Sequence, residues 1–269
     1  MSIHEQLAAQ IAQLRQDTGR PIVQGILGGQ GAGKTTLALT LISLLELMGY
    51  RTVSLSLDDL YKTYSERIAL QTLDPRLVWR GPPGTHDVEL GLTVLDAVRH
   101  SQTPISIPRF DKSAHNGAGD RTNPEIFTNN IDILIFEGWF VGARPIDPII
   151  FDTPIPPIVS AADRSFARDM NQQLAGYLPL WERLDSLIVL YPQDYRYSIN
   201  WRKQAEHEMI ASGRPGMTDI QIEEFVNYFW RALHPELFIK PLITSPDVDT
   251  VIEIGADHTF TKIYHPKSS

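Results

Sequence analysis

The sequence contains no cysteine, and this absence excludes two kinds of site. Without thiols the chain can form no disulfide bond and can hold no metal through thiolate ligands. No apolar run approaches the roughly 18 residues that a membrane-spanning helix needs. The formal net charge is −8 at pH 7, whereas proteins that bind duplex nucleic acid usually carry a basic face. We therefore expect neither a membrane nor a nucleic acid as a partner.

Patterns typical of strands and of helices alternate along the chain, whose 269 residues are 42% hydrophobic. Alternation of this kind predicts an α/β fold with a mostly parallel central sheet and helices on both faces, in a single domain over residues 1–269. The predicted strands cover residues 21–29, 51–57, 103–108, 131–138, 185–191 and 249–254. The predicted helices cover residues 34–49, 87–100, about 160–176, 196–212 and 218–233.

Three segments need separate interpretations. Residues 1–19 have an apolar period near 3.6 and end in glycine, which predicts an amphipathic helix rather than a signal or transit peptide and favours a cytoplasmic location. Residues 109–121 are charged and contain glycine, and they show no period, so we expect an irregular loop. Residues 142–160 contain five prolines and predict a surface excursion packed on the domain.

The segment "GGQGAGKT", residues 28–35, matches the phosphate-binding pattern G-x-x-x-x-G-K-[ST]. In such a loop, backbone N–H groups surround the phosphates, Lys34 neutralises the β and γ oxygens, and the Thr35 hydroxyl reaches Mg²⁺. A predicted strand precedes the pattern and an apolar helix follows it, as this motif requires. We expect a nucleoside triphosphate to bind at Gly28, Gly29, Gln30, Gly31, Ala32, Gly33, Lys34, Thr35 and Thr36.

Glu137, where the apolar run "ILIF" ends, is the acidic residue that we expect beside the metal ion, in addition to the Thr35 hydroxyl. A carboxylate that leaves a buried strand suits the Walker B position, where it holds Mg²⁺ directly or through water. The alternative is an ordinary acid that caps a turn at the end of the strand. No Asp precedes Gly at the spacing of a GTPase switch, so a GTPase is not indicated.

Two adjacent acids, Asp58 and Asp59, end the strand-like segment "LSLDDLY". Ligands bind at the carboxyl ends of parallel strands, so a carboxylate here can accept the proton of an attacking hydroxyl. Strand alternation sends the two acids to opposite faces, so we expect only one to act as the base. The pattern S-x-D-x-x-Y resembles the matching segment of uridine kinase and pantothenate kinase, which implies that Asp58 is the base. Asp59 would then orient a neighbour or cap the next helix, although both acids could also cap a loop.

Further motifs extend this resemblance over about residues 20–255. They are "WRGPPGTHD" (79–87), "IPRFDKSAHNGAGDR" (107–121), "FEGWF" (136–140) and "RKQAEHEMIASGRPGMTD" (202–219). Together with the phosphate loop, these motifs resemble the P-loop glycerate kinases of plants and cyanobacteria and a related fungal group. That family lies within the uridine kinase, phosphoribulokinase and pantothenate kinase-like superfamily. The resemblance implies a three-layer P-loop kinase with a helical lid at about residues 195–216, and the ATP-dependent phosphorylation of D-glycerate to 3-phosphoglycerate in photorespiration.

The resemblance also suggests which residues face the acceptor. His86 and Asp87 could hold a substrate hydroxyl, although Asp87 could instead cap the helix that follows. A glycerate carboxylate needs a cation, and each candidate could equally be a solvated loop charge. The candidate cations are Arg80, Arg109, Lys112 and Arg121.

The predicted lid offers Arg202, with Arg196 as a second choice, to stabilise the transferring phosphoryl group. The alternative for Arg202 is a surface pair with Glu206, four residues further along the helix. Two other functions stay open: a kinase for a pantothenate- or nucleoside-like acceptor, and a nucleotide-binding regulator without turnover. The sequence defines no oligomeric state.

Overall fold

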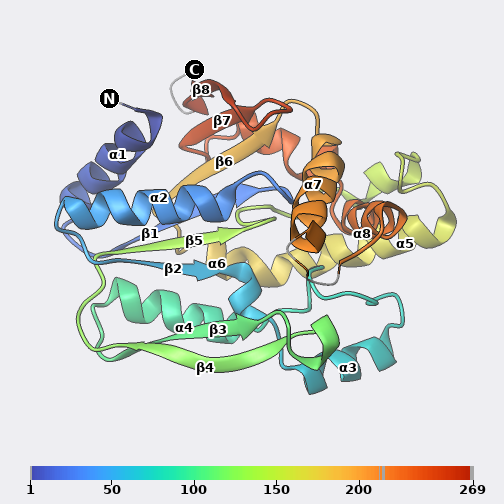
Figure 1. The fold of residues 1–269 in the computed structure, drawn as a ribbon, viewed down its shortest axis with the longest axis horizontal. Coiled ribbons are helices and arrows are strands. Elements are labelled where there is room, and N and C mark those ends of the chain that lie inside the picture. The colour runs from blue at the N-terminus through green and yellow to red at the C-terminus, as the bar shows by residue number, and fades with distance from the viewer. Residues whose placement is uncertain (1, 212, 214–215, 267–269) are drawn as a thin grey trace.

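The computed structural model describes residues 2–211, 213 and 216–266. Its centre is a six-stranded sheet in the order β2-β5-β1-β6-β7-β8 (Figure 1). The first five strands of this order run parallel, and β8 runs antiparallel to β7. The strands are β1 (Ile22–Gly28), β2 (Thr52–Ser56), β5 (Ile133–Gly138), β6 (Ser186–Pro192), β7 (Thr250–Ile254) and β8 (Phe260–Tyr264).

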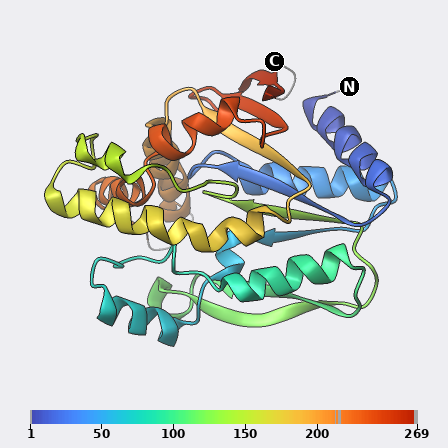
Figure 2. The same cartoon turned by 180° about the vertical axis from the view of Figure 1, so that it is seen from behind.

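Helices cover both faces of this sheet, as Figures 1 and 2 show from opposite sides. On one face, α1 (Ile3–Thr18), α2 (Lys34–Leu47) and α7 (Tyr197–Ala211) share a buried apolar cluster with the strands. On the other face, α4 (Val88–Arg99), α5 (Ala161–Gln173) and α6 (Leu178–Trp181) contribute to a second cluster. The predicted three-layer α/β fold with a mostly parallel sheet is therefore confirmed. None of the described helices is long and apolar enough to cross a membrane.

Burial explains why these segments fold as they do. Every residue of β1 is buried, because helices cover the strand on both sides. Helix α2 buries Leu37, Ala38, Leu41 and Leu45, a spacing that places them on one face of the helix toward the sheet. The described residues also form the helices α3 (Tyr64–Leu73), α8 (Asp219–Ala232) and α9 (Pro235–Phe238).

The prediction of an irregular loop at residues 109–121 was wrong at both ends. Strand β3 (Ile105–Asp111) pairs antiparallel with β4 (Asp120–Phe127) in a separate two-stranded sheet. The segment 103–108, predicted from the same alternation that implied the parallel sheet, therefore lies outside that sheet. Strand β4 is mostly exposed and contains Pro124, so it lacks the apolar alternation that would have revealed it.

The proline-rich segment 142–160 contains a single 3-10 turn, η3 (Pro148–Asp152), and its Phe151 and Ile158 are buried in the core. Helix α3 begins with a capping box between Thr63 and Glu66 and buries no residue. Parts of three predicted segments lie outside the described residues. They are residue 1 of the predicted first helix, residues 212, 214 and 215 of the predicted lid, and residues 267–269 of the predicted domain.

Candidate active site

The phosphate loop connects β1 to α2 and depends on the conformation of its glycines. Gly31 and Gly33 have φ angles of +75° and +85°, in the left-handed region that glycine adopts without strain. A Cβ atom on Gly31 would lie 2.7 Å from the Cβ of Trp201, so α7 packs directly against the loop. The loop therefore lies between the sheet and α7, at the edge toward which the arrows of β2 and β5 point in Figure 1.

Lys34, Thr35 and Glu137 lie together at this edge. The Lys34 ammonium donates to the carbonyl of Gly29 at 3.1 Å, and the Thr35 hydroxyl donates to the Glu137 carboxylate at 3.4 Å. Burial lowers the pKa of Lys34, while the negative charges of Glu137 and Asp58 act in the opposite direction. Glu137 is buried at the end of β5, the strand next to β1. The cation and the hydroxyl, both at the start of α2, thus meet the carboxylate at the end of β5.

The donor set suits a magnesium ion that is shared with a nucleotide. Mg²⁺ prefers oxygen ligands and commonly takes only one or two from the protein, completing its shell with phosphates and water. Thr35 and Glu137 supply two such oxygens. Within the described part of the chain, no group of three or more His, Cys, Asp or Glu residues could hold a metal by itself. The residues fit a metal that arrives with the phosphates.

Asp58 lies in a 3-10 turn, η1 (Leu57–Leu60), that follows β2 directly. We predicted that strand alternation sends Asp58 and Asp59 to opposite faces of the sheet. That reasoning was wrong, because β2 ends at Ser56 and neither acid lies in the strand. The Lys112 ammonium lies 2.7 Å from Asp58, and the Tyr61 hydroxyl also hydrogen-bonds to it. Burial raises the pKa of the Asp58 carboxyl, but Lys112 and Tyr61 outweigh burial and bring the pKa below its usual value.

Asp59 holds the backbone around Asp58 in place. Its carboxylate accepts from the N–H of Ser56 at 3.0 Å, closing a capping box around η1, and from the N–H of Phe110 at 3.2 Å. Arg109 donates to the same carboxylate at 3.3 Å. Asp59 therefore caps the turn and ties β3 to it, so the two adjacent acids differ in their surroundings.

His86 is 2% exposed and lies under the site. Its ring stacks on Tyr61, and its Nδ1 lies 2.8 Å from the Tyr177 hydroxyl. Its Nε2 is buried and has no hydrogen-bond partner. Burial lowers the pKa of His86 to about 3, so the ring is neutral at ordinary pH.

Most of the predicted acceptor ligands already have partners in the protein. Asp87 caps α4 by accepting from the N–H of Leu90, and Arg121 donates to it at 2.8 Å. Arg121 also donates to the carbonyl of Tyr61. Asp87 thus has the capping role that the sequence left open. Arg121 joins β4 to the segment that follows Asp58.

Arg80, Arg109 and Lys112 differ in how they are held. Arg80 donates to the carbonyls of Gly117 and Ala118, in the connection between β3 and β4. Arg109 binds Glu125, on β4, as well as Asp59. Lys112 is 64% exposed and contacts Asp58. Lys112 is therefore the cation of this group that lies directly on the predicted base.

Arg202 follows Trp201 on α7, and Trp201 contacts the phosphate loop. Its guanidinium binds Glu206 at 2.9 Å and lies over the ring of Phe225, while its Nε is buried without a partner. The i,i+4 pair that the sequence offered as an alternative is therefore present. Arg196, the second choice, is exposed and pairs with Asp194.

Two residues of the site had no predicted role. Tyr61 hydrogen-bonds to Asp58, stacks on His86, and has a pKa raised well above its usual value, first by burial and then by Asp58. Tyr177 orients His86. The tyrosine of the S-x-D-x-x-Y pattern was a signal for Tyr61, whereas nothing near Tyr177 in the sequence connects it to this site.

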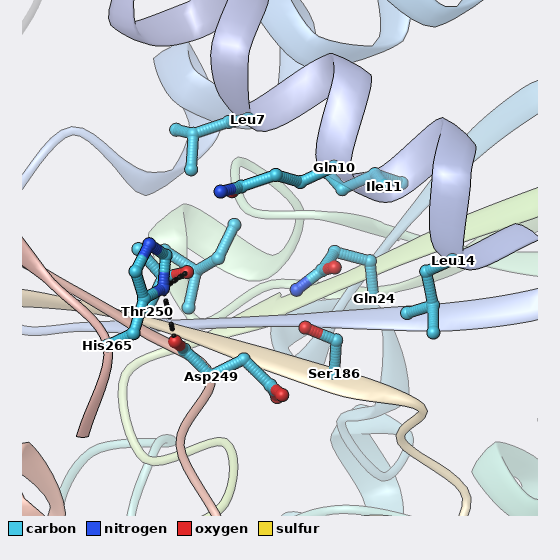
Figure 3. Close-up of a pocket in the computed structure, with 10 residues that line it drawn as sticks. Leu7, Gln10, Ile11, Leu14, Gln24, Ser186, Asp249, Thr250 and His265 are labelled. Atoms are coloured by element: carbon cyan, nitrogen blue, oxygen red, sulfur yellow. Dashed lines mark hydrogen bonds between the residues drawn. The ribbon is translucent and has the colours of Figure 1, made fainter. Parts of the chain in front are cut away.

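A cavity of about 320 Å³ lies at the opposite edge of the sheet, beneath α1 (Figure 3). Its floor includes Gln24, Ser186 and Thr250, which lie near the amino-terminal ends of β1, β6 and β7. Ligands of open parallel sheets bind at the carboxyl ends of the strands. This cavity is therefore separate from the phosphate loop.

Comparison with known proteins is consistent with this site. No family model matches the chain. The chain is 37% identical over 223 residues to "Uncharacterized kinase mug58" of Schizosaccharomyces pombe, covering 78% of this chain and 79% of that protein. It is 31% identical over 252 residues to the chloroplastic D-glycerate 3-kinase of Arabidopsis thaliana, covering 88% of this chain and 53% of that protein.

The structural comparison agrees with the sequence comparison. A D-glycerate 3-kinase from Cryptococcus neoformans superposes with a TM-score of 0.86 at 27% identity, covering 98% of this chain and 99% of that chain. The chain spans about half the length of the Arabidopsis relative but nearly all of the Cryptococcus structure. The chain therefore belongs to the family of P-loop kinases that includes the D-glycerate 3-kinases.

Proposed function

We propose that this protein transfers the γ-phosphoryl group of ATP to D-glycerate and forms 3-phosphoglycerate. Two relatives are named for this activity. The observation that carries the proposal is the pair of Asp58 and Lys112, 2.7 Å apart and beside the phosphate loop. D-glycerate fits such a pair, because its carboxylate and its reacting 3-hydroxyl lie at opposite ends of a three-carbon chain, so one can meet the cation while the other meets the base.

The phosphate loop and Lys34 would bind the ATP phosphates. Asp58 would accept the proton of the acceptor hydroxyl while the hydroxyl oxygen forms a bond to the γ-phosphorus. The bond from that phosphorus to the β–γ bridging oxygen breaks, ADP leaves, and Asp58 later releases its proton to water. Lys34 and Arg202 would stabilise the charge on the transferring group. This role requires Arg202 to exchange Glu206 for phosphate oxygens when α7 closes.

Thr35 would hold Mg²⁺ directly, and Glu137 would hold it through water. The ion, when bound with ATP, neutralises charge on the β- and γ-phosphates. The arrangement of Thr35 and Glu137, two oxygen donors 3.4 Å apart, supports this proposal. ATP binding measured by calorimetry should weaken in EDTA and recover with added MgCl₂, and the Glu137→Gln variant should lose most of that dependence on the metal.

On the acceptor side, Lys112 would bind the carboxylate, and neutral His86 would hydrogen-bond to a hydroxyl if its Nε2 becomes accessible on closure. The other four predicted ligands would act mainly by holding the frame around the acceptor, since protein groups already occupy them. They are Arg80, Asp87, Arg109 and Arg121.

The decisive experiment measures ATP consumption by the purified protein with Mg²⁺ and a single acceptor. Stimulation by D-glycerate, absent with L-glycerate, pantothenate and uridine and lost in Asp58→Asn, is the expected result. Stimulation by pantothenate or uridine instead would replace the acceptor while keeping the kinase. Binding of ATP without consumption with any of the four acceptors would favour a regulator.

Two predictions concern the role of the protein in the cell. A role in photorespiration and a location in the cytoplasm follow from the sequence interpretation alone and stay predictions. Fluorescence of the tagged protein in its own cells would test the location. Accumulation of glycerate after deletion of its gene, under conditions that favour photorespiration, would test the role.

A further inference from the structure

The predicted base is paired in this structure with an exposed cation. Lys112 lies 2.7 Å from Asp58, and their side chains are 64% and 29% exposed. A carboxylate that neutralises an ammonium ion at this distance is a weaker base than a free one. An acceptor that approached without removing Lys112 would therefore meet a base with reduced affinity for its proton.

The backbone beside Lys112 is held by several contacts, whereas the Lys112 side chain is largely exposed and forms an ion pair with Asp58. Asp59 binds the N–H of Phe110, and Arg121 binds the carbonyl of Tyr61, so β3 and β4 are both tied to the segment of the base. Lysine has a flexible four-carbon stem. Its ammonium can therefore move from one anion to another nearby while β3 and β4 stay in place.

The neighbouring cations lack this freedom. Arg80 binds two carbonyls of the connection between the strands, Arg109 binds Asp59 and Glu125, and Arg121 binds Asp87. Moving any of them would break contacts that hold the hairpin. Moving Lys112 breaks one ion pair whose ammonium is largely exposed, and such a pair is weaker than a buried one.

We propose that Lys112 masks Asp58 until the carboxylate of an acidic acceptor takes Lys112 away from it. The same lysine would then recognise the acceptor and release the base, so the carboxylate of the acceptor would promote the chemical step as well as binding. A neutral alcohol or water would leave the base masked. This inference rests on the proposed function, because it requires an acceptor that carries a carboxylate near the reacting hydroxyl.

The test compares D-glycerate with glycerol, which has the hydroxyls and lacks the carboxylate. The buffers contain no glycerol apart from the amount added as an acceptor. In Lys112→Met we expect kcat/KM for D-glycerate to fall at least about tenfold. We expect kcat for glycerol and the basal rate of ATP hydrolysis to rise several-fold in the same variant, because the base is unmasked. Lys262→Met, on β8, controls for the loss of one positive charge.

Two other outcomes would overturn the proposal while keeping the kinase. Lower rates with D-glycerate but unchanged rates with glycerol and water would make Lys112 a carboxylate ligand only. A rise in KM for ATP with lower rates for all acceptors would make it a phosphate ligand. Lys112→Arg keeps the positive charge, so a basal rate as high as that of Lys112→Met would show that charge does not mask the base.

The unaltered protein offers a test that needs no variant. With D-glycerate bound, Lys112 is away from Asp58, so the pKa of the base is higher than with glycerol bound. The acid limb of kcat against pH should therefore lie at higher pH for D-glycerate than for glycerol. Coincident limbs would overturn the proposal. If D-glycerate were not phosphorylated at all, the proposed function would fail together with this inference.

Discussion

The phosphate side and the acceptor side of this site are built in different ways. On the phosphate side, consecutive residues form the loop, and two glycines with positive φ set its shape. On the acceptor side, five separate segments meet, and their side chains bind one another: Asp59 with Arg109, Asp87 with Arg121, and His86 with Tyr177. The phosphate side thus depends on backbone conformation and the acceptor side on a network of side chains.

This difference suggests how to distinguish charged groups that maintain the fold from charged groups that bind a ligand. A charged group on the acceptor side that has several protein partners maintains the network. A group with few partners is available to a ligand. Asp58 and Asp59 make the comparison directly, because they are neighbours in the chain and only Asp59 binds several backbone and side-chain groups.

The largest expected effect separates these two acids. Asp58→Asn should lower kcat about 10³-fold with little change in melting temperature, because it removes the base and keeps the shape of the side chain. Asp59→Asn should lower stability by about 1 kcal/mol through its capping and hairpin contacts, with a much smaller change in kcat. Steady-state kinetics and thermal melting of both variants test the division. Equal losses of kcat would contradict it.

The next effect concerns the helix that lies against the phosphate loop. Arg202→Ala should lower kcat about 10²-fold if its guanidinium reaches the transferring phosphoryl group. Arg196→Ala, just before the start of the same helix, is the matched control, because Arg196 is exposed and forms an ion pair with Asp194. Similar kcat values for the two variants would leave Arg202 as the ion-pair partner of the buried Glu206.

The acceptor network should respond to pH through His86. Its pKa is lowered from 6.5 to about 3 in the folded protein, so between these values the unfolded chain binds more protons and stability rises with pH. Going from about pH 7.5 to about pH 5 should therefore remove about 2 kcal/mol of stability through this residue. The free energy of unfolding in urea, measured at both pH values, tests this.

A matched variant isolates that contribution from other titrating groups. His86→Gln should show a pH dependence smaller by the same amount, because glutamine does not titrate. An equal pH dependence in the variant would mean that His86 is not the group responsible.

The smallest expected effect tests the backbone of the phosphate loop. Gly31→Ala should raise KM for ATP about tenfold, because its Cβ would meet Trp201 and its φ is positive. Gly49→Ala is the control, since Gly49 has a φ of +91° with nothing within 4 Å of the added Cβ. The control should cost about 1 kcal/mol of stability and leave KM unchanged. A similar KM in both variants would mean that packing of α7 on the loop does not matter.

The sequence by itself determined the parallel sheet, its covering helices and the phosphate loop. Each of these is a local pattern: apolar runs for β1 and β5, a long apolar segment for α2, and consecutive loop residues between β1 and α2. Local patterns of this kind act through backbone geometry and burial, which do not depend on distant partners.

Only the tertiary structure decided which charged residues belong to the network of side chains on the acceptor side. Arg109, Lys112 and Arg121 look alike as cations in one polar segment, and their roles differ through contacts with residues about 34 to 55 positions away in the chain. The role of Tyr177 was not predicted for the same reason, whereas β4 was missed because it is mostly exposed and lacks apolar alternation. A side chain's freedom to bind a ligand depends on which partners already occupy it, and those partners are brought to it by the fold.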